Sequence, residues 1–126
     1  MMSATTLFFT KDHEWVSVAG DEATIGITDH AQQALGDITF VDLPKVGKTV
    51  NAHDVLLVVE SVKAASDVFA PVSGTVSAVN EKLVGAPEQI NQSAQAEGWL
   101  CKLKPFVSAM SGLMTAEQYG AFLQET

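Results

Sequence analysis

The sequence predicts a small, mainly β domain, and three observations carry that prediction. Short segments of alternating apolar and polar residues recur along the chain, Gly and Pro separate them, and only two short stretches have helical character. A chain of 126 residues has the size of one domain and can bury a core, so we expect a single domain over residues 1–126. No apolar run approaches the length of a membrane span, so we expect no membrane contact.

The first two expected strands form an antiparallel hairpin. Residues 14–18 alternate, Gly20 and Asp21 supply a turn, and residues 23–28 form the second strand. A short helix over residues 30–35 is expected to follow this second strand.

The start and end of that helix have recognisable signals. Thr28 or Asp29 can cap it, and Gly36 stops it. Residues 38–43 then alternate again and predict a strand. A P-x-x-G turn ends this strand, and the same motif recurs in the segment 70–76. The two copies indicate either two similar halves of a sandwich or two unrelated turns.

The centre of the chain predicts a second hairpin, over residues 54–71. The apolar run 55–59 is too short for a helix and rich in β-branched side chains, so it indicates a strand buried on both faces. Extended structure resumes at residues 68–71, which places Lys63 at or near the tip. The link has no Gly, Asn or Pro, which favours a type I-based turn over types I′ and II′.

Lys63 has three interpretations on this pattern. It is a solvated turn lysine, a Schiff-base lysine or a lysine presented for covalent modification. A Schiff-base lysine needs a desolvated pocket, which a protruding tip does not provide. A modifying enzyme needs an exposed amine with small neighbours on a rigid base, and Ser61 and Ala64 are small.

The C-terminal third predicts a loop, a strand and a helix. Residues 81–95 are expected to form a surface loop with one helical turn at most, and residues 99–104 form the last strand. The helix at about residues 115–125 begins with Thr115 as N-cap, and Gln118 completes a capping box. The apolar face of this helix should dock on the sheet and comprises Tyr119, Phe122 and Leu123.

Charge and composition exclude several classes of function. The net charge is −8 and the chain has no arginine, which argues against nucleic-acid binding and suits a soluble monomer. The single cysteine, Cys101, lies in an alternating segment that should bury it, and it has no disulfide partner. His13, His30 and His53 lack metal-ligand spacing, so we expect no metal site. What remains is a carrier or binding module with one displayed lysine, not an enzyme.

The chain resembles the glycine cleavage system H-protein family along nearly its whole length. The matching segments are H-E-W-V at 13–16, I-G-I-T at 25–28, L-G-D-I at 35–38, E-S-V-K-A at 60–64, A-P-V-S-G at 70–74 and G-W-L at 98–100. The resemblance implies a β-sandwich of the lipoyl/biotinyl-carrier type, a barrel-sandwich hybrid, with an added C-terminal helix.

The resemblance also implies a cofactor and a set of partners. It implies lipoate in amide linkage to Lys63, within a recognition segment formed by Glu60, Ser61, Val62 and Ala64. It implies transfer of an aminomethyl group from glycine decarboxylase (P protein) to aminomethyltransferase (T protein), then reoxidation by dihydrolipoyl dehydrogenase (L protein). A lipoate ligase or lipoyl transferase would attach the cofactor.

In this family the loaded arm folds back into a cleft, and Glu14 and Asp67 match positions near it. Two carboxylates there would hold a cationic aminomethyl group. The alternative interpretation is that both are ordinary solvated surface groups without a functional role. Too few residues precede Lys11 for a signal or transit peptide, so we expect a cytoplasmic bacterial protein, or a mitochondrial matrix protein if the chain is processed.

The sequence departs from the family pattern at three places outside the lysine segment. His30 stands where tyrosine is frequent, Lys45 replaces a common glutamate, and Gln95-Ala96 replaces a more usual pair before Gly98. Three related functions remain as alternatives: a biotin carrier, a lipoyl domain of another complex, and an H-like protein that only relays lipoate. Biotinyl lysines are typically flanked by methionines, which Lys63 is not.

Overall fold

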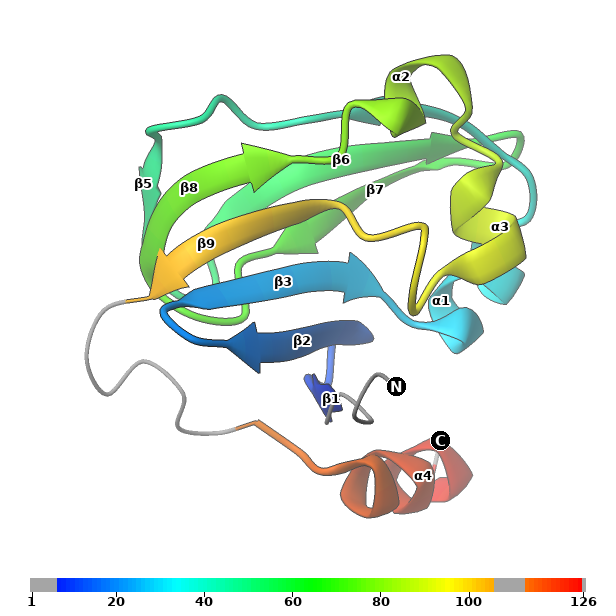
Figure 1. Ribbon diagram of the computed structural model, residues 1–126. Coiled ribbons are helices and arrows are strands. Elements are labelled where there is room, and N and C mark those ends of the chain that lie inside the picture. Colours follow the sequence, from blue (N-terminus) through cyan, green and yellow to red (C-terminus); the bar gives the residue numbers. More distant parts are fainter. Residues whose placement is uncertain (1–6, 106–112, 126) are drawn as a thin grey trace, which may run out of the picture.

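The computed structural model describes residues 7–105 and 113–125. They form two β-sheets and four helices, as Figure 1 shows. The strands are β1 Leu7–Phe9, β2 Glu14–Ala19, β3 Glu22–Ile27, β4 Ile38–Asp42, β5 Thr49–Val50, β6 Val55–Ser61, β7 Ala65–Phe69, β8 Gly74–Val79 and β9 Cys101–Pro105. The helices are α1 Asp29–Leu35, α2 Lys82–Gly85, α3 Gln89–Ser93 and α4 Ala116–Glu125.

The two sheets are antiparallel and of unequal size. The larger has six strands in the order β1-β2-β3-β9-β8-β5, and the smaller has three in the order β4-β6-β7. The chain passes from the small sheet to the large one twice, from β4 to β5 and from β7 to β8. The two P-x-x-G turns occupy these two crossings, which favours two similar halves over two unrelated turns. The expected mainly β sandwich is confirmed.

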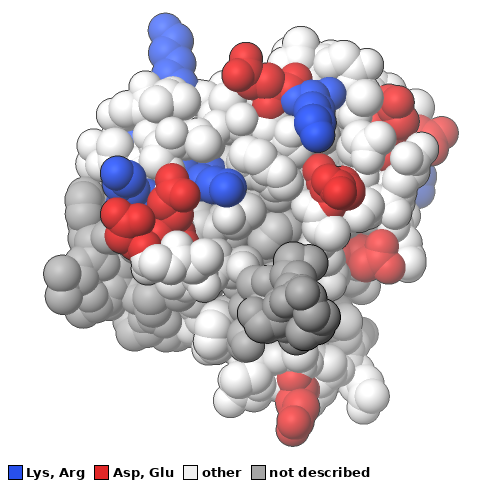
Figure 2. Space-filling view, in the orientation of Figure 1, with Lys and Arg blue, Asp and Glu red and all other residues white. Residues whose placement is uncertain are grey.

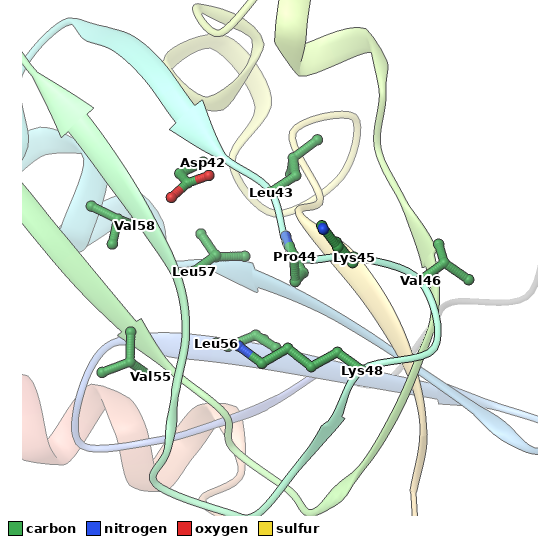
Figure 3. Close-up of a pocket in the computed structure, with 10 residues that line it drawn as sticks. All are labelled: Asp42, Leu43, Pro44, Lys45, Val46, Lys48, Val55, Leu56, Leu57 and Val58. Atoms are coloured by element: carbon green, nitrogen blue, oxygen red, sulfur yellow. The ribbon is translucent and has the colours of Figure 1, made fainter.

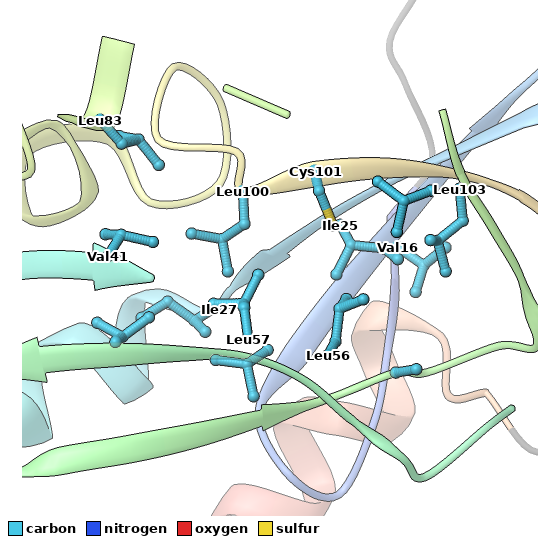
Figure 4. Packing of buried hydrophobic residues seen from close by; sticks show 14 of the residues in the cluster. Val16, Ile25, Ile27, Val41, Leu56, Leu57, Leu83, Leu100, Cys101 and Leu103 are labelled. Atoms are coloured by element: carbon cyan, nitrogen blue, oxygen red, sulfur yellow. The ribbon is translucent and has the colours of Figure 1, made fainter. Parts of the chain in front are cut away.

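The main hydrophobic core lies between the two sheets (Figure 4). Ile25 of β3, Leu57 of β6 and Leu103 of β9 are among its buried members, and Cys101 is fully buried there as expected. Complete burial of branched aliphatic side chains contributes roughly 1.5–3 kcal/mol each. This core therefore fixes the base of the β6–β7 hairpin.

The N-terminal part follows the expected order, with one additional strand. The hairpin of β2 and β3 is present, and Thr28 caps α1 with its side chain while Gly36 ends it with a φ of 80°. Strand β1 was not expected, because three residues are too short for a recognisable alternation. The helix after the second expected strand is therefore α1 after β3. Similarly, the two-residue strand β5 lay within an expected link.

Two sequence expectations are wrong. The segment 81–95 contains two short helices, α2 and α3, not a loop with one helical turn at most. Each buries a single apolar residue, Leu83 in α2 and Ile90 in α3, so periodicity could not reveal them. The run 55–59 is also not buried throughout, because Val55 is 43% exposed beyond the end of β4, which pairs with β6 only as far as Val58.

Helix α4 begins with the expected capping box. The Thr115 hydroxyl accepts the backbone N–H of Gln118 at 3.2 Å, and the Gln118 side chain accepts the N–H of Thr115 at 2.9 Å. The expected apolar face packs against β1 and β2 in a second cluster, in which Tyr119 stacks on Phe9. The expectation of one domain over residues 1–126 also covers residues 1–6, 106–112 and 126, which lie outside the described part.

The charged side chains are scattered on the face shown in Figure 2, with acidic and basic groups side by side. That face therefore carries no broad field of one sign. None of the helices described is long and apolar enough to cross a membrane.

Candidate functional site

The tip of the β6–β7 hairpin runs from Ser61, the last residue of β6, to Ala64, which precedes β7. The Ser61 backbone N–H donates to the carbonyl of Ala64 at 2.8 Å, and the Ser61 hydroxyl oxygen accepts the N–H groups of Lys63 at 3.1 Å and Ala64 at 3.2 Å. The Val62 N–H donates to the carbonyl of Asp37 at 3.0 Å, which ties the tip to the start of β4. The Ser61 hydroxyl and these backbone hydrogen bonds therefore hold the tip in one conformation.

The backbone of the link agrees with the expected turn class. Neither Val62 nor Lys63 has a positive φ, whereas types I′ and II′ require one. Val62 is 66% exposed, and Lys63 and Glu60 are exposed as well. The structure thus places the lysine on the surface at the end of a strand whose base is buried.

The side chain of Lys63 lies beside the end of α1. A Cβ atom added to Gly36 would be 3.6 Å from Lys63 Cε and 3.8 Å from a methyl group of Val62. The neighbour of Gly36, Leu35, lines a cleft beside the hairpin. The lysine therefore extends next to the mouth of this cleft.

The cleft has a volume of about 280 Å³. Its walls come from the turn before β2, the first residue of β2, the last residue of β3, α1 and β7. They include Asp12, His13, Glu14, Ile27, His30, Ala31, Ala34, Leu35, Ser66, Asp67 and Val68. Glu14 and Asp67, which the sequence analysis paired, thus line the same cleft although they are far apart in the chain. The two carboxylates differ sharply in environment.

Glu14 is buried, with 2% of its surface exposed. Its carboxyl oxygens accept the Thr10 hydroxyl at 2.7 Å and the Phe69 backbone N–H at 3.0 Å. Loss of hydration on burial raises the pKa of Glu14 to about 7, although both hydrogen bonds act in the opposite direction. The alternative interpretation of Glu14 as a solvated carboxylate is wrong. Asp67, in contrast, is exposed at the edge of the cleft.

The sequence analysis missed the role of two histidines in this cleft. His13 and His30 were noted in the sequence only for their lack of metal-ligand spacing, yet their rings are 4.6 Å apart at the cleft wall. His13 has a φ of 65°, the left-handed residue of the β1–β2 turn, which is unusual for a side chain larger than glycine. His13 and Glu14 are adjacent in the sequence, but only this turn brings both to the cleft.

Helix α4 also reaches this site. The Tyr119 hydroxyl lies 2.7 Å from His13 Nδ1 and 2.9 Å from Thr28 Oγ1. The sequence predicted that this helix docks on the sheet through an apolar face that includes Tyr119. It could not predict the polar contact of Tyr119 with His13, because the two residues are 106 positions apart.

A second, wider hollow of about 580 Å³ lies at the other end of β6 (Figure 3). Its lining combines the start of β6 with the segment after β4 and contains Lys45 and Lys48. The hollow is at the opposite end of the strand from Lys63, so it is not part of the lysine site. Within the described ranges, no three His, Cys, Asp or Glu residues are grouped so as to hold a metal ion.

Comparison with known proteins agrees with the sequence motifs and with the fold. The family model of the glycine cleavage H-protein matches residues 7–126. A glycine cleavage system H protein of Phenylobacterium zucineum is 55% identical over 116 residues, covering 91% of this chain and 96% of the relative. One of Nitratidesulfovibrio vulgaris is 52% identical over 115 residues, covering 91% of this chain and 90% of the relative.

A solved structure supports the same assignment at the level of the fold. The crystal structure of a glycine cleavage system H protein from Mycobacterium marinum superposes with a TM-score of 0.88 at 38% identity, covering 97% of this chain and 99% of that chain. With a family model over nearly the whole sequence and relatives above half identity, the chain belongs to the glycine cleavage H-protein family.

Proposed function

We propose that this protein is the lipoyl-bearing carrier of a glycine cleavage system and that Lys63 is its attachment site. The observation that carries the proposal is the exposed Lys63 at the end of a strand with a buried base, next to a cleft that contains a buried carboxyl group. The family assignment supports the same role. A carrier needs an accessible amine and a nearby place to shelter its load, and it needs no catalytic group of its own.

The residues present fit a lipoyl group. The amine of Lys63 is accessible to a lipoate ligase or a lipoyl transferase, and its neighbours Ser61 and Ala64 are small. The exposed Glu60 and Val62 belong to the segment that we assign to recognition by this modifying enzyme. When bound, lipoate supplies a reversible dithiol/disulfide couple that carries the aminomethyl group. The partners would be glycine decarboxylase, aminomethyltransferase and dihydrolipoyl dehydrogenase.

The protein's own contribution is to shelter the cationic load. Glu14 and Asp67 line the cleft beside Lys63, and a carboxylate attracts a cation more strongly in a partly desolvated site than in water. The hydrogen bonds from Thr10 and Phe69 fix the carboxyl group of Glu14 in place, while the exposed Asp67 can adjust. Two carboxylates attract an ammonium group carried on the arm and repel an anionic one.

Lipoylation of the apo protein tests the proposal. We expect lipoate ligase, with ATP and lipoate, to add one lipoyl group to Lys63 and none to Lys63→Ala, as seen by intact mass and peptide mapping. Lys45→Ala is the matched control, because Lys45 is also exposed but lies on the segment after β4. It should be modified like the wild type. Modification of another lysine, or of Lys63→Ala, would refute the assignment of the site.

Reconstitution then separates glycine cleavage from lipoate relay. The lipoylated protein should support glycine decarboxylation when it is mixed with a glycine decarboxylase, an aminomethyltransferase and a dihydrolipoyl dehydrogenase. A protein that only transfers lipoate to other lipoyl domains would show no glycine-dependent release of carbon dioxide in this mixture.

A further inference from the structure

One hydroxyl group connects the C-terminal helix to the cleft. Tyr119 is buried in α4, with its ring stacked on Phe9 at 4.7 Å between centroids and an interplanar angle of 6°. Its hydroxyl contacts His13 Nδ1 at 2.7 Å and Thr28 Oγ1 at 2.9 Å. Because Thr28 caps α1 and His13 lines the cleft, Tyr119 joins α4 to two of the elements that build the cleft walls.

The directions of these hydrogen bonds follow from the protons available. Thr28 is fully buried, and its Oγ1 already accepts the backbone N–H of Ala31 at 3.2 Å. The proton of a buried hydroxyl group needs an acceptor, and the oxygen of Tyr119 is the acceptor within reach. Thr28 therefore donates to Tyr119, and the Tyr119 proton is donated to His13 Nδ1. The reverse order would leave the Thr28 proton without an acceptor among the described residues.

A histidine whose Nδ1 accepts a hydrogen bond carries its proton on Nε2 when it is neutral. No described residue forms a hydrogen bond with Nε2 of His13. We infer that Tyr119 is a positioning residue that holds His13 as the Nε2–H tautomer, so that the ring carries a fixed N–H donor in the cleft that Glu14 also lines. This inference rests on the proposed function, because it assigns the donor to the docked lipoyl arm.

The chemistry of the arm suits such a pair of groups. Sulfur is a weak hydrogen-bond acceptor, so an N–H donor suits the sulfur end of the arm, while the carboxylates suit its cationic load. A neutral His13 also adds no positive charge near that load. The titratable groups that face the ring or share its cleft are Tyr119, Asp12, Glu14, His30 and Asp67. Burial and the adjacent His30 lower the pKa of His13, and Asp12 partly opposes them, which favours the neutral ring.

The tautomer can be measured directly by long-range ¹H–¹⁵N NMR of the His13 ring in the full chain. We expect an unprotonated Nδ1 and a protonated Nε2 in the wild type. Tyr119→Phe keeps the ring stack and removes the hydroxyl, so the ring is no longer held in one tautomer and a minor Nδ1–H population should appear beside the Nε2–H form. Thr115→Ala is the control, because it weakens the cap of α4 but retains the Tyr119 hydroxyl, and it should resemble the wild type. An Nδ1–H wild type, or a Tyr119→Phe spectrum with the wild-type tautomer alone, would overturn the inference.

The effect on the arm is a second readout. Protein loaded with the aminomethyl group is kept without partner enzymes, and the release of formaldehyde and ammonia is followed. We expect a severalfold faster release from Glu14→Gln/Asp67→Asn and a smaller but measurable increase from Tyr119→Phe. An increase in the double variant alone would refute the role of Tyr119 and leave the docking of the arm intact. No increase in either variant would refute the docking in this cleft, while Lys63 remains the attachment site.

Discussion

At the scale of single residues, the site depends on a carboxyl group that the fold takes out of water. Glu14 stands in an alternating segment whose even positions, Glu14 and Val16, face the same way, and both are buried. Burial raises the pKa of Glu14 to about 7, so this carboxyl group titrates near neutral pH. Loading the arm with a cation should favour the ionised form, because an opposite charge nearby lowers the pKa of a carboxyl group. The proton affinity of Glu14 and the load would then be coupled.

This raised pKa makes stability depend on pH in a defined direction. Between the ordinary value of 4.5 and about 7, the folded state retains the Glu14 proton that the unfolded state has lost. The contribution of the Glu14 proton to the free energy of unfolding is therefore complete below the pKa of Glu14 in the unfolded state. It is lost as the pH rises through the pKa of the folded state, by about 3 kcal/mol at most.

A comparison of the wild type with Glu14→Gln isolates the pH-dependent contribution of Glu14 to the free energy of unfolding. Urea unfolding of both apo proteins between pH 4 and 8 should show the wild type losing stability relative to the variant as the pH rises. The effects of the other carboxyl groups on stability are the same in both proteins, so they cancel in the difference. Parallel curves would show that Glu14 titrates normally in the folded protein.

The sequence could predict the exposed position of Lys63 at the hairpin tip but not the burial of Glu14, and the reason is physical. A displayed lysine requires only local features, namely a buried strand followed by a short link of small residues. The burial of Glu14 requires the β1–β2 turn and β7 to meet, since the hydrogen-bond donors are Thr10 and Phe69. The pairing of Glu14 with Asp67 came from the family resemblance, not from the pattern of residues.

At the scale of secondary-structure elements, the cleft wall depends on the close pairing of β2 and β3. Trp15 pairs with Gly26 across these strands, and the indole N–H donates to the carbonyl of Ala94 at 2.9 Å. The indole therefore lies over a position without a side chain. The short helix α3 was unpredictable because its contacts are distant in sequence: Ile90 is buried in the core, and Asn91 forms hydrogen bonds with Gln32, Gly36 and Ile38. The capping box of α4 was predictable because it is local in sequence.

Gly26→Ala tests this pairing. The added Cβ would meet ring atoms of Trp15 at 2.5–2.6 Å, so the indole or the strand must move. We expect a loss of roughly 1–3 kcal/mol in the free energy of unfolding. Gly120→Ala is the control, because nothing lies within 4 Å of the added Cβ and the site is in α4. Alanine there should leave the stability unchanged or raise it by up to about 1 kcal/mol. Equal urea midpoints for the wild type and Gly26→Ala would contradict the contact.

At the scale of the whole molecule, the residues that stabilise the sandwich are separate from the exposed lysine at the hairpin tip. The core spans both sheets and includes Leu57 near the base of β6, while Lys63 is outside it at the far end of the same hairpin. The two P-x-x-G crossings place β4 and the β6–β7 hairpin in one small sheet over the larger one. The proposed lipoyl group on the tip would therefore require no change in the packing that supports the hairpin.

Two substitutions in this one hairpin test the separation. Leu57→Ala should lower the free energy of unfolding by about 2–5 kcal/mol, because it leaves a cavity between the sheets. Its folded fraction should still accept lipoate at Lys63 as fast as the wild type does. Lys63→Ala should change stability by less than about 0.5 kcal/mol, since an exposed side chain is removed, yet it should accept no lipoate. The measurements are urea midpoints and ligase rates on the same samples. A lower midpoint for Lys63→Ala would mean that the lysine supports the fold. Slow lipoylation of Leu57→Ala, under conditions where it is fully folded, would mean that the packing of the core affects the conformation of the tip.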